Sequence, residues 1–373
     1  MPIHGKPIEE RIAWLFELAE RHGAEFRSPE ASLARRRYLA EHPTAIVVMK
    51  CMDGRVNIPV VTNTPVGILM PLRNLGGRFD LGWPHLGEVL THHVLQMVGM
   101  GRRVLILVTY HFSKGSRERG CAGFHYDTAA AIRHTHEIKR QIEHIFGAAH
   151  GTVYPLIVGL ETDEDALIVH GAGEARLDLA ALGEAERPQL AERLAALLPD
   201  MPAQMRADLL PLLEGNLARI ATVRAQIARH ERQLDFDHRE WMICLGRGFD
   251  FLHTPNVALI IGPYSPKLDE PVRTAASIIE ANMAAGRIPD DGFLLLSSAP
   301  YDEIGVDRAR AELKSRFLSG FAAEVIRAEF PTLAGKMTMR TAVLDWRSRQ
   351  LEVIGAEDAA QCAVPPAPTF SAS

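Results

Sequence analysis

Apolar residues follow two different patterns along the chain. Residues 8–22 and 29–40 carry apolar positions at helical spacing, so we expect an N-terminal helical arm over residues 1–43. From residue 44 onward, short apolar runs alternate with amphipathic segments, which is the order expected of buried strands joined by helices. The pattern therefore predicts an α/β fold, with a mainly parallel β-sheet flanked by helices.

The predicted elements form two successive α/β units. Strands are expected at 45–50, 66–71, 104–110, 152–158 and 166–169 in the first unit and at 241–245, 257–261 and 293–297 in the second, with helices at 86–97, 127–146 and 272–285. The stretch over about 175–235 is rich in Ala, Leu, Glu and Arg, and it predicts a helical insert whose charges face solvent. These elements define a first domain over 44–240 that includes the insert, a second over 241–360, and a Pro-rich tail, 361–373, that we expect to be disordered.

The second unit resembles a degenerate copy of the first. Residues 242–249 can be laid over residues 49–56, which places Cys244 on Cys51 but puts glycines where the first unit has an acidic and a basic residue. This overlay predicts that only the first unit is active.

A second overlay supports the same view of the C-terminal half. Residues 293–301 resemble residues 104–111, but without the histidine that ends the earlier run. Chance similarity between buried strands is the competing explanation, because such strands draw on the same few apolar residue types.

Composition limits the classes of partner. The 373 residues carry a formal net charge of −5, with 47% hydrophobic and 23% charged residues, and no basic stripe that would indicate nucleic acid or an anionic membrane surface. No apolar run reaches the ~18 residues of a membrane span, and the N-terminus lacks a secretory pattern. We therefore expect a cytoplasmic protein that acts on small molecules.

Cysteine usage directs attention to two positions. The four cysteines, Cys51, Cys121, Cys244 and Cys362, are too few and too scattered for a disulfide framework. Cys244 and Cys362 are expected to be small buried hydrophobic residues. Cys51 and Cys121 differ because of the polar residues around them.

The segment Cys51-Met-Asp53-Gly-Arg55 follows the first predicted strand. In extended chain the side-chain period is two, so Cys51, Asp53 and Arg55 project to one side and share a cleft. In isolation, Asp53 and Arg55 would be interpreted as a surface ion pair that contributes little.

Further metal ligands are available at the end of a neighbouring strand. His111 closes the run that starts at residue 104, and Cys121 precedes a predicted helix entry. Two thiolates and one imidazole favour zinc, and three protein ligands leave the open fourth position of a catalytic site. In a chain with 16 histidines, however, one histidine near a cysteine also arises by chance.

These residues resemble the β-class carbonic anhydrases. That family carries Cys-x-Asp-x-Arg after its first strand, then Arg-Asn-Ala-Gly, then a strand ending in His and followed by Cys-Gly. The matching positions here, in the same order, are Cys51-Met-Asp53-Gly-Arg55, Arg73-Asn74-Leu75-Gly76-Gly77, a helix bearing Glu88, His111 and Cys121-Ala122-Gly123.

The spacing of the last two ligands is similar to that of the carboxysome-shell subgroup. Ordinary members separate the histidine and the cysteine by two residues, whereas nine residues intervene here. The subgroup also has an N-terminal helical region and a second copy that lacks zinc, so the resemblance covers most of residues 1–355. Its members usually begin with a longer extension used in packaging, and only about forty-four residues precede the first predicted strand here. Association with a carboxysome shell or with Rubisco is therefore left open.

The resemblance implies a function and a set of site residues. It implies a zinc-dependent carbonic anhydrase (carbonate dehydratase, a lyase) that interconverts carbon dioxide and bicarbonate by zinc-bound hydroxide. Cys51, His111 and Cys121 would bind Zn²⁺. Asp53 and Arg55 would be catalytic, and a swing of Asp53 onto the zinc would close the site. A homodimer is also implied.

Two other functions and several roles stay open at this point. A carbon disulfide or carbonyl sulfide hydrolase on the same scaffold is one alternative, and a shell or scaffold protein with structural zinc is another. Residues 113–120 would serve as a mobile lid or as an ordinary surface loop, and residues 73–77 as a wall of the substrate cleft or as a tight turn. The candidate proton carriers are His92, His93, His125, His134 and His136, none of which the sequence singles out.

Overall fold

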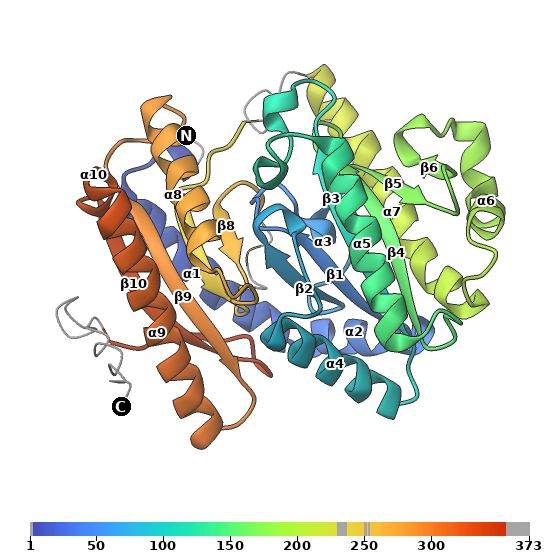
Figure 1. Ribbon diagram of the computed structural model, residues 1–373, viewed down its shortest axis with the longest axis horizontal. Helices are drawn as coiled ribbons and strands as arrows, with labels where there is room; N and C mark the ends of the chain where they lie inside the picture. The colour runs from blue at the N-terminus through green and yellow to red at the C-terminus, as the bar shows by residue number, and fades with distance from the viewer. Residues whose placement is uncertain (1–2, 230–236, 250–251, 253, 356–373) are drawn as a thin grey trace, which may run out of the picture.

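The computed structural model describes residues 3–229, 237–249, 252 and 254–355. It contains two β-sheets, each lined by helices, that lie side by side (Figure 1). The predicted α/β class with a second α/β copy is therefore confirmed. The predicted disordered tail and Cys362 lie outside the described residues.

The first sheet has six strands in the order β2-β1-β3-β4-β5-β6. Their bounds are β1 Ala45–Cys51, β2 Leu69–Asn74, β3 Val104–Phe112, β4 Val153–Glu161, β5 Ala166–His170 and β6 Arg176–Asp178. The strands β2, β1, β3 and β4 are parallel, and β5 and β6 are antiparallel additions at one edge. The four parallel strands therefore end at the same edge of the sheet, which is where open α/β sheets bind ligands.

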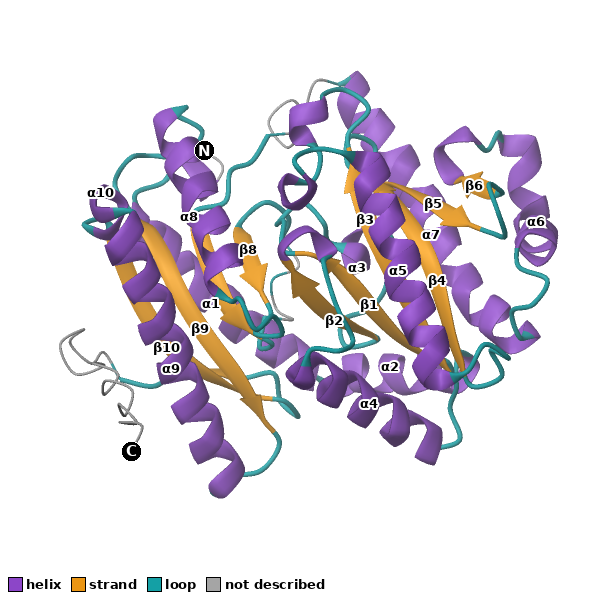
Figure 2. Ribbon diagram, in the orientation of Figure 1, coloured by secondary structure: helices purple, strands orange, loops and turns teal. Residues whose placement is uncertain are grey.

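Helices cover both faces of this sheet (Figure 2). Their bounds are α2 Pro29–Glu41, α3 Ile58–Val61, α4 Pro84–Gly99, α5 Thr128–Phe146, α6 Leu190–Leu197 and α7 Ala203–Ala228, and the helix α1 Ile8–Arg27 precedes them in the chain. The odd-numbered residues Val47 and Met49 of β1 pack with α4 and α5, and the even-numbered Ile46 and Val48 belong to the core that includes α7. Both faces of β1 are buried, which explains its continuous apolar run.

The strand β2 begins three residues later than predicted. Gly67 takes a positive φ of 86°, and the Ile68 amide donates to the Pro65 carbonyl, so a turn occupies the start of the apolar run. The strand instead extends to Asn74, and Arg73 becomes part of it.

The helical insert is fastened to the first sheet by buried polar side chains. Asn216 of α7 accepts from the Leu167 amide and donates to the carbonyls of Val61 and Asp165, at 2.7–2.9 Å. Asp208 accepts from the Thr44 amide at 2.9 Å, next to the start of β1. The insert thus orients the first sheet as well as presenting charges to solvent.

The second sheet has five strands in the order β11-β10-β9-β7-β8. The bounds are β7 Met242–Gly246, β8 Ala258–Ile261, β9 Phe293–Tyr301, β10 Met337–Asp345 and β11 Leu351–Val353, with helices α8 Asp269–Ala284, α9 Val306–Glu329 and α10 Pro331–Ala334. The sequence did not predict the elements from α9 onward. The buried face of α9 is built of small residues, including Ala311, Ser315, Ser319, Ala322 and Ala323, so it lacks a strong apolar stripe.

The two sheets share one topology. Strands β8, β7, β9, β10 and β11 correspond in order and direction to β2, β1, β3, β4 and β5, since both series are parallel except for the last strand. The registers also agree. Val104 pairs with Val153 in the first sheet, and Phe293 pairs with Met337 at the matching position of the second.

This register corrects one of the sequence overlays. Laying residues 293–301 on residues 104–111 is consistent with the ladders, and Pro300 then takes the place of His111. The same ladders align Met242 with Ile46, so Arg247 takes the place of Cys51. The overlay of Cys244 on Cys51 is therefore wrong by three residues. The overlay matches two cysteines, which do not occupy equivalent positions in the strands. Because a shift by an odd number of residues puts a side chain on the opposite face of a strand, Cys244 does not face the edge that Cys51 faces.

Backbone hydrogen bonds join the two halves along a seam between β2 and β8. The amides of Asn256, Ile260 and Gly262 donate to carbonyls of the first half, those of Gly54, Met52 and Arg73 respectively, at 2.8–2.9 Å. The second half therefore lies directly against the segment that follows β1.

The first N-terminal helix, α1, packs against the second half. The fully buried Arg11 of α1 donates to the Asp291 carboxylate and to the Gly292 carbonyl beside β9, and its guanidinium lies over the Trp241 ring. Among the described residues, no helix has both the length and the apolar character needed to cross a bilayer.

Candidate metal centre

Three predicted ligands meet at the C-terminal edge of the first sheet. Cys51 ends β1 and His111 is the last but one residue of β3, and the pairing of Met49 with Val108 sets these strand ends side by side. Cys121 follows the loop after β3 and precedes a short 3-10 turn, Ala122–Phe124. All three side chains are buried, with exposed fractions of 5% or less.

The three residues fit a metal ion. One candidate ligand atom from each of Cys51, His111 and Cys121 lies within 4.8 Å of the others, and the two Sγ atoms are 4.0 Å apart. Thiolates held about 2.3 Å from a tetrahedral zinc would be about 3.8 Å apart. Neither ring nitrogen of the buried His111 has a hydrogen-bond partner among the described residues. A buried imidazole without a partner is costly, and a metal ion would supply one.

The thiols are already polarised by each other. The pKa of Cys51 lies below its ordinary value, mainly because the Cys121 thiol hydrogen-bonds to it, with His111 adding to the effect against the opposing effect of burial. The same contact raises the pKa of Cys121. The site is therefore prepared to hold a sulfur anion, which is the form that binds metal.

Glycines let two loops approach each other behind the ligands. A Cβ on Gly123 would lie 2.6 Å from the Gly76 Cα. Gly76 and Gly77 have φ values of 67° and 64°, so residues 75–77, directly after β2, form a tight turn that needs glycine dihedrals, while Arg73 and Asn74 belong to the strand. Larger residues at these positions would push the Cys121 loop away from β1.

Asp53 and Arg55 form a buried, bidentate pair beside the cluster. The Asp53 carboxylate accepts from the Arg55 amide at 2.8 Å, from its Nε at 3.1 Å and from its Nη2 at 2.7 Å. Their exposed fractions are 4% and 7%, so this is not the exposed ion pair that the two residues would suggest in isolation.

The pair keeps Asp53 ionised. Burial alone would raise the pKa of the Asp53 carboxyl, but Arg55, then His238 and His111, outweigh it and hold that pKa below its ordinary value. Burial likewise lowers the pKa of Arg55, but Asp53 more than compensates. The Asp53 Oδ2 lies 3.9 Å from the His111 Nε2, so a fixed carboxylate borders the metal cluster.

Two residues of the segment that leads into the second half, which the sequence did not point to, complete the site. His238 Nε2 lies 3.0 Å from Arg55 Nη2, and its Nδ1 lies 2.9 Å from a carboxylate oxygen of Glu240. Because the guanidinium only donates, Nε2 accepts and Nδ1–H donates to Glu240. The fully buried Glu240 also accepts from the Gly54 amide at 3.1 Å. His238 and Glu240 stand just before β7, and the only sequence signal was an acidic residue adjoining a buried strand.

Burial and a histidine act in opposite directions on Glu240. Burial raises the pKa of the Glu240 carboxyl, but the adjacent His238 lowers it by more than burial raises it. The net pKa is therefore below the ordinary value. Glu240, His238, Arg55 and Asp53 therefore form a continuous polar chain from the start of β7 to the Cys-His-Cys cluster.

The loop over residues 113–120 is anchored on both sides. Asp163 accepts from the Ser113 hydroxyl and from the Gly115 amide, and Arg119 lies 3.2 Å from Asp237. The Arg119 carbonyl accepts from Arg55 Nη2 at 3.0 Å. These contacts favour a fixed wall of the site over a mobile lid.

The predicted proton carriers lie in different places. His92 and His93 of α4 line a separate cleft, and His134 accepts from the Phe79 amide at 3.2 Å. His125 lines a cleft of about 570 Å³ together with His238, the histidine that contacts Arg55. For His136, no contact connects it with the cluster among the described residues.

Comparison with known proteins gives one family. Residues 44–185 match the model of the carboxysome shell carbonic anhydrase catalytic domain. This segment contains all five site residues that the sequence predicted.

Similar proteins with the same name occur in several bacteria. A carboxysome shell carbonic anhydrase of Hydrogenovibrio crunogenus is 28% identical over 247 residues, covering 57% of this chain and 46% of that protein. Those of Prochlorococcus marinus and Parasynechococcus marenigrum are 27% and 28% identical over 239 residues, covering 56% of this chain and 46% and 41% of theirs. The chain thus matches less than half the length of these relatives. The similarity to the carboxysome shell carbonic anhydrase family therefore rests on the segment 44–185.

Proposed function

We propose that the protein is a zinc-dependent carbonic anhydrase, which interconverts carbon dioxide and bicarbonate. The observation that carries this proposal is the convergence of Cys51, His111 and Cys121 on one point beside a buried, ionised Asp53. The names of the similar proteins support the same activity.

Zinc is proposed as the metal because of the donor set. Two sulfurs and one imidazole nitrogen with tetrahedral spacing suit zinc, and three protein ligands leave a fourth position for water. Zinc at such a site lowers the pKa of a bound water toward neutrality and so provides the nucleophile for hydration.

Asp53 is proposed to orient the nucleophile. As an ionised carboxylate it only accepts hydrogen bonds, so it holds the proton of the nucleophile and turns a lone pair toward carbon dioxide. Arg55 fixes the carboxylate with three donated hydrogen bonds and prevents it from taking up a proton at neutral pH. In this arrangement Asp53 is bound to Arg55 and is not part of the Cys-His-Cys cluster among the described residues.

His238 is proposed as a positioning residue. It links the buried Glu240 to Arg55 and so restrains the guanidinium that holds Asp53. This role resembles the way in which a buried carboxylate orients a histidine, and through it the reacting group, in hydrolases.

Shell association and dimer formation are part of the proposal. The similar proteins are named for the carboxysome shell, which suggests that this protein works in the cytoplasm, within or against such a shell. Co-sedimentation with purified shells and light scattering of the isolated protein would test the shell contact and the homodimer separately.

Stopped-flow assays test the activity. The parent protein should hydrate carbon dioxide, and Asp53→Ala should retain the metal while kcat/KM falls by about 10²–10⁴-fold. Parallel assays with carbonyl sulfide and carbon disulfide test the hydrolase alternative. Turnover of those gases alone would contradict the proposal, as would hydration that is unchanged by Asp53→Ala. A zinc-containing protein with no activity toward any of the three gases would be a scaffold protein with structural zinc.

A further inference from the structure

The edge of the second sheet that corresponds to the metal centre has a different chemistry. Strand register places Arg247 at the position of Cys51 and Pro300 at that of His111. Both residues line a cleft of about 810 Å³ between the halves, bounded on the other side by α4. Ligands of open α/β sheets bind at this edge, so loss of the metal ligands leaves a binding position with new side chains.

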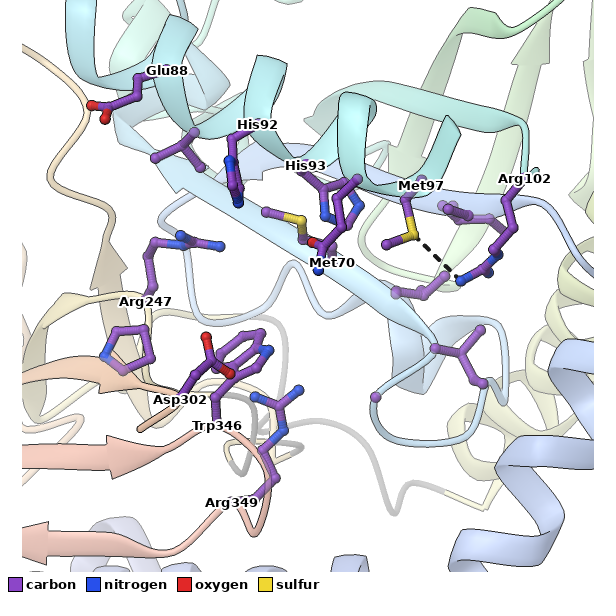
Figure 3. Close-up of a pocket in the computed structure, with 18 of the residues that line it drawn as sticks. Met70, Glu88, His92, His93, Met97, Arg102, Arg247, Asp302, Trp346 and Arg349 are labelled. Carbon is purple, nitrogen blue, oxygen red and sulfur yellow. Dashed lines mark hydrogen bonds between the residues drawn. The ribbon is translucent and has the colours of Figure 1, made fainter. Parts of the chain in front are cut away.

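Figure 3 shows how side chains from both halves face this cleft. Arg247 reaches from the end of β7 toward His92 and Met70, which belong to the first half, while Trp346 and Arg349 come from the turn after β10. The volume is that of a small-molecule site.

Cations at the Arg247 end lack acidic partners. Among the described residues, no carboxylate lies within salt-bridge distance of Arg247, Arg310 or Lys314. The Lys314 Nζ instead lies 3.1 Å from the His85 Nε2. Asp307 also lines this end, but its carboxylate accepts from two backbone amides at the start of α9. The three cations therefore produce an excess of positive charge.

The same cations disfavour further positive charge nearby. Burial lowers the pKa of Lys314, and Arg247 adds to this effect. Burial, then Lys314 and Arg247, lower the pKa of His85, and for both groups Glu88 opposes the shift without reversing it. Burial, then Arg247, lowers the pKa of His93 to about 4. A bound anion would relieve this repulsion.

A buried hydroxyl in the adjoining pocket has no partner. Ser298 is fully buried, and its Oγ has no hydrogen-bond partner among the described residues. It lines a pocket of about 180 Å³ together with Arg247, Arg310 and Lys314. The neighbouring Ser297, by contrast, donates to the Ser315 carbonyl on the opposite face of β9. The pocket therefore presents the three cations to a ligand, whereas the Ser298 Oγ packs against Gly248, where an added Cβ would lie 2.4 Å from it.

We propose that this edge of the second sheet binds the phosphoryl group of a small molecule through Arg247, Arg310 and Lys314. Guanidinium and ammonium groups bind phosphate oxygens by charge-assisted hydrogen bonds. The larger cleft beside the pocket accommodates an organic part next to Trp346. The site is independent of the metal centre and of the activity proposed above.

Titration calorimetry with inorganic phosphate and with phenyl phosphate, at constant ionic strength, tests the site. The parent protein should bind at least one of them in the millimolar range or tighter, and Arg247→Gln should weaken binding by about tenfold or more. Arg36→Gln, which removes an equally charged side chain from the exposed face of α2, is the matched control and should bind as the parent does. Tighter binding of phenyl phosphate would identify an ester as the ligand, and equal binding would identify phosphate itself.

Two further variants keep the test decisive. Lys314→Gln removes a second cation from the same pocket and should weaken binding about 3- to 10-fold, even if Arg247→Gln folds poorly. Cys51→Ser removes a proposed metal ligand and should leave binding unchanged, which separates this site from anions bound at the metal. Absence of binding by the parent, or equal binding by Arg247→Gln and Arg36→Gln, would overturn the proposal.

Discussion

The two halves of the molecule have the same strand order and register but opposite chemistry at the same edge. The first half places Cys51, His111 and an ionised Asp53 there, and the second places Arg247 and Pro300. Topology therefore supplies the location of a site, and a few residues at the strand ends decide what the location binds. The segment that leads into the second half has a further role, because it contributes His238 and Glu240 to the proposed metal centre.

The largest expected difference between the halves is in metal binding. Cys51→Ser should lower zinc from about one per chain to near zero and should lower carbon dioxide hydration by about 10³-fold or more, because one of three ligands is lost. Cys244→Ala changes the buried cysteine of the second half and should leave zinc content unchanged. Metal analysis of both purified variants measures this difference. Equal zinc loss in the two would mean that the halves do not differ in this way.

The contribution of the segment that leads into the second half to catalysis should be intermediate in size. His238→Ala should lower kcat/KM by about tenfold, since Arg55 loses a partner while the Cys-His-Cys cluster is untouched. His238→Gln, which retains a hydrogen-bonding side chain, should restore part of the loss. Zinc content and the pH profile of hydration should be recorded together. If His238→Ala lost zinc together with activity, His238 would only maintain the structure of the metal site and would not position Arg55.

The seam between the halves should be sensitive to a single methyl group. A Cβ on Gly54 would lie 2.7 Å from the Ala258 carbonyl oxygen, so Gly54→Ala should lower the free energy of unfolding by about 1–3 kcal/mol. Gly99→Ala at the end of α4 meets no atom within 4 Å and is the control, which should be neutral or slightly stabilising. Denaturant unfolding measures both changes. Equal stability of the two variants would mean that the seam relaxes without cost.

The smallest effect concerns acid stability. Glu240 has a pKa below its ordinary value when folded, so the folded state binds fewer protons than the unfolded state in that range. Its contribution to stability is present above the ordinary carboxyl pKa and is lost as the pH falls through the lower, folded value. Glu240→Gln should therefore show a shallower decline of stability below about pH 4.5 than the parent does. An unchanged slope in urea unfolding from pH 6 to pH 3 would contradict this.

The sequence predicted those parts of the site that depend on local pattern. Cys51, Asp53 and Arg55 lie within five consecutive residues after a buried strand, and His111 ends another, so their proximity follows from parallel topology. The order of helices and strands in the first half could also be predicted from the sequence, because its buried strands are apolar on both faces.

The missing parts depend on contacts between distant segments. His238 lies 183 residues from Arg55, and only the seam between β2 and β8 brings them together. The same applies to the cleft at Arg247, which takes its far wall from α4. The true alignment of the halves also required the strand ladders, because a shared cysteine was a misleading guide to register.

The seam has a consequence for how freely the second half can change. The contacts from Asn256, Ile260 and Gly262 use main-chain atoms only, so they persist under most substitutions of the surrounding side chains. A copy attached in this way can lose its own reactive groups and acquire others without detaching from its neighbour. Sequence divergence in one repeat is thereby tolerated, provided that the few residues reaching into the other repeat are kept.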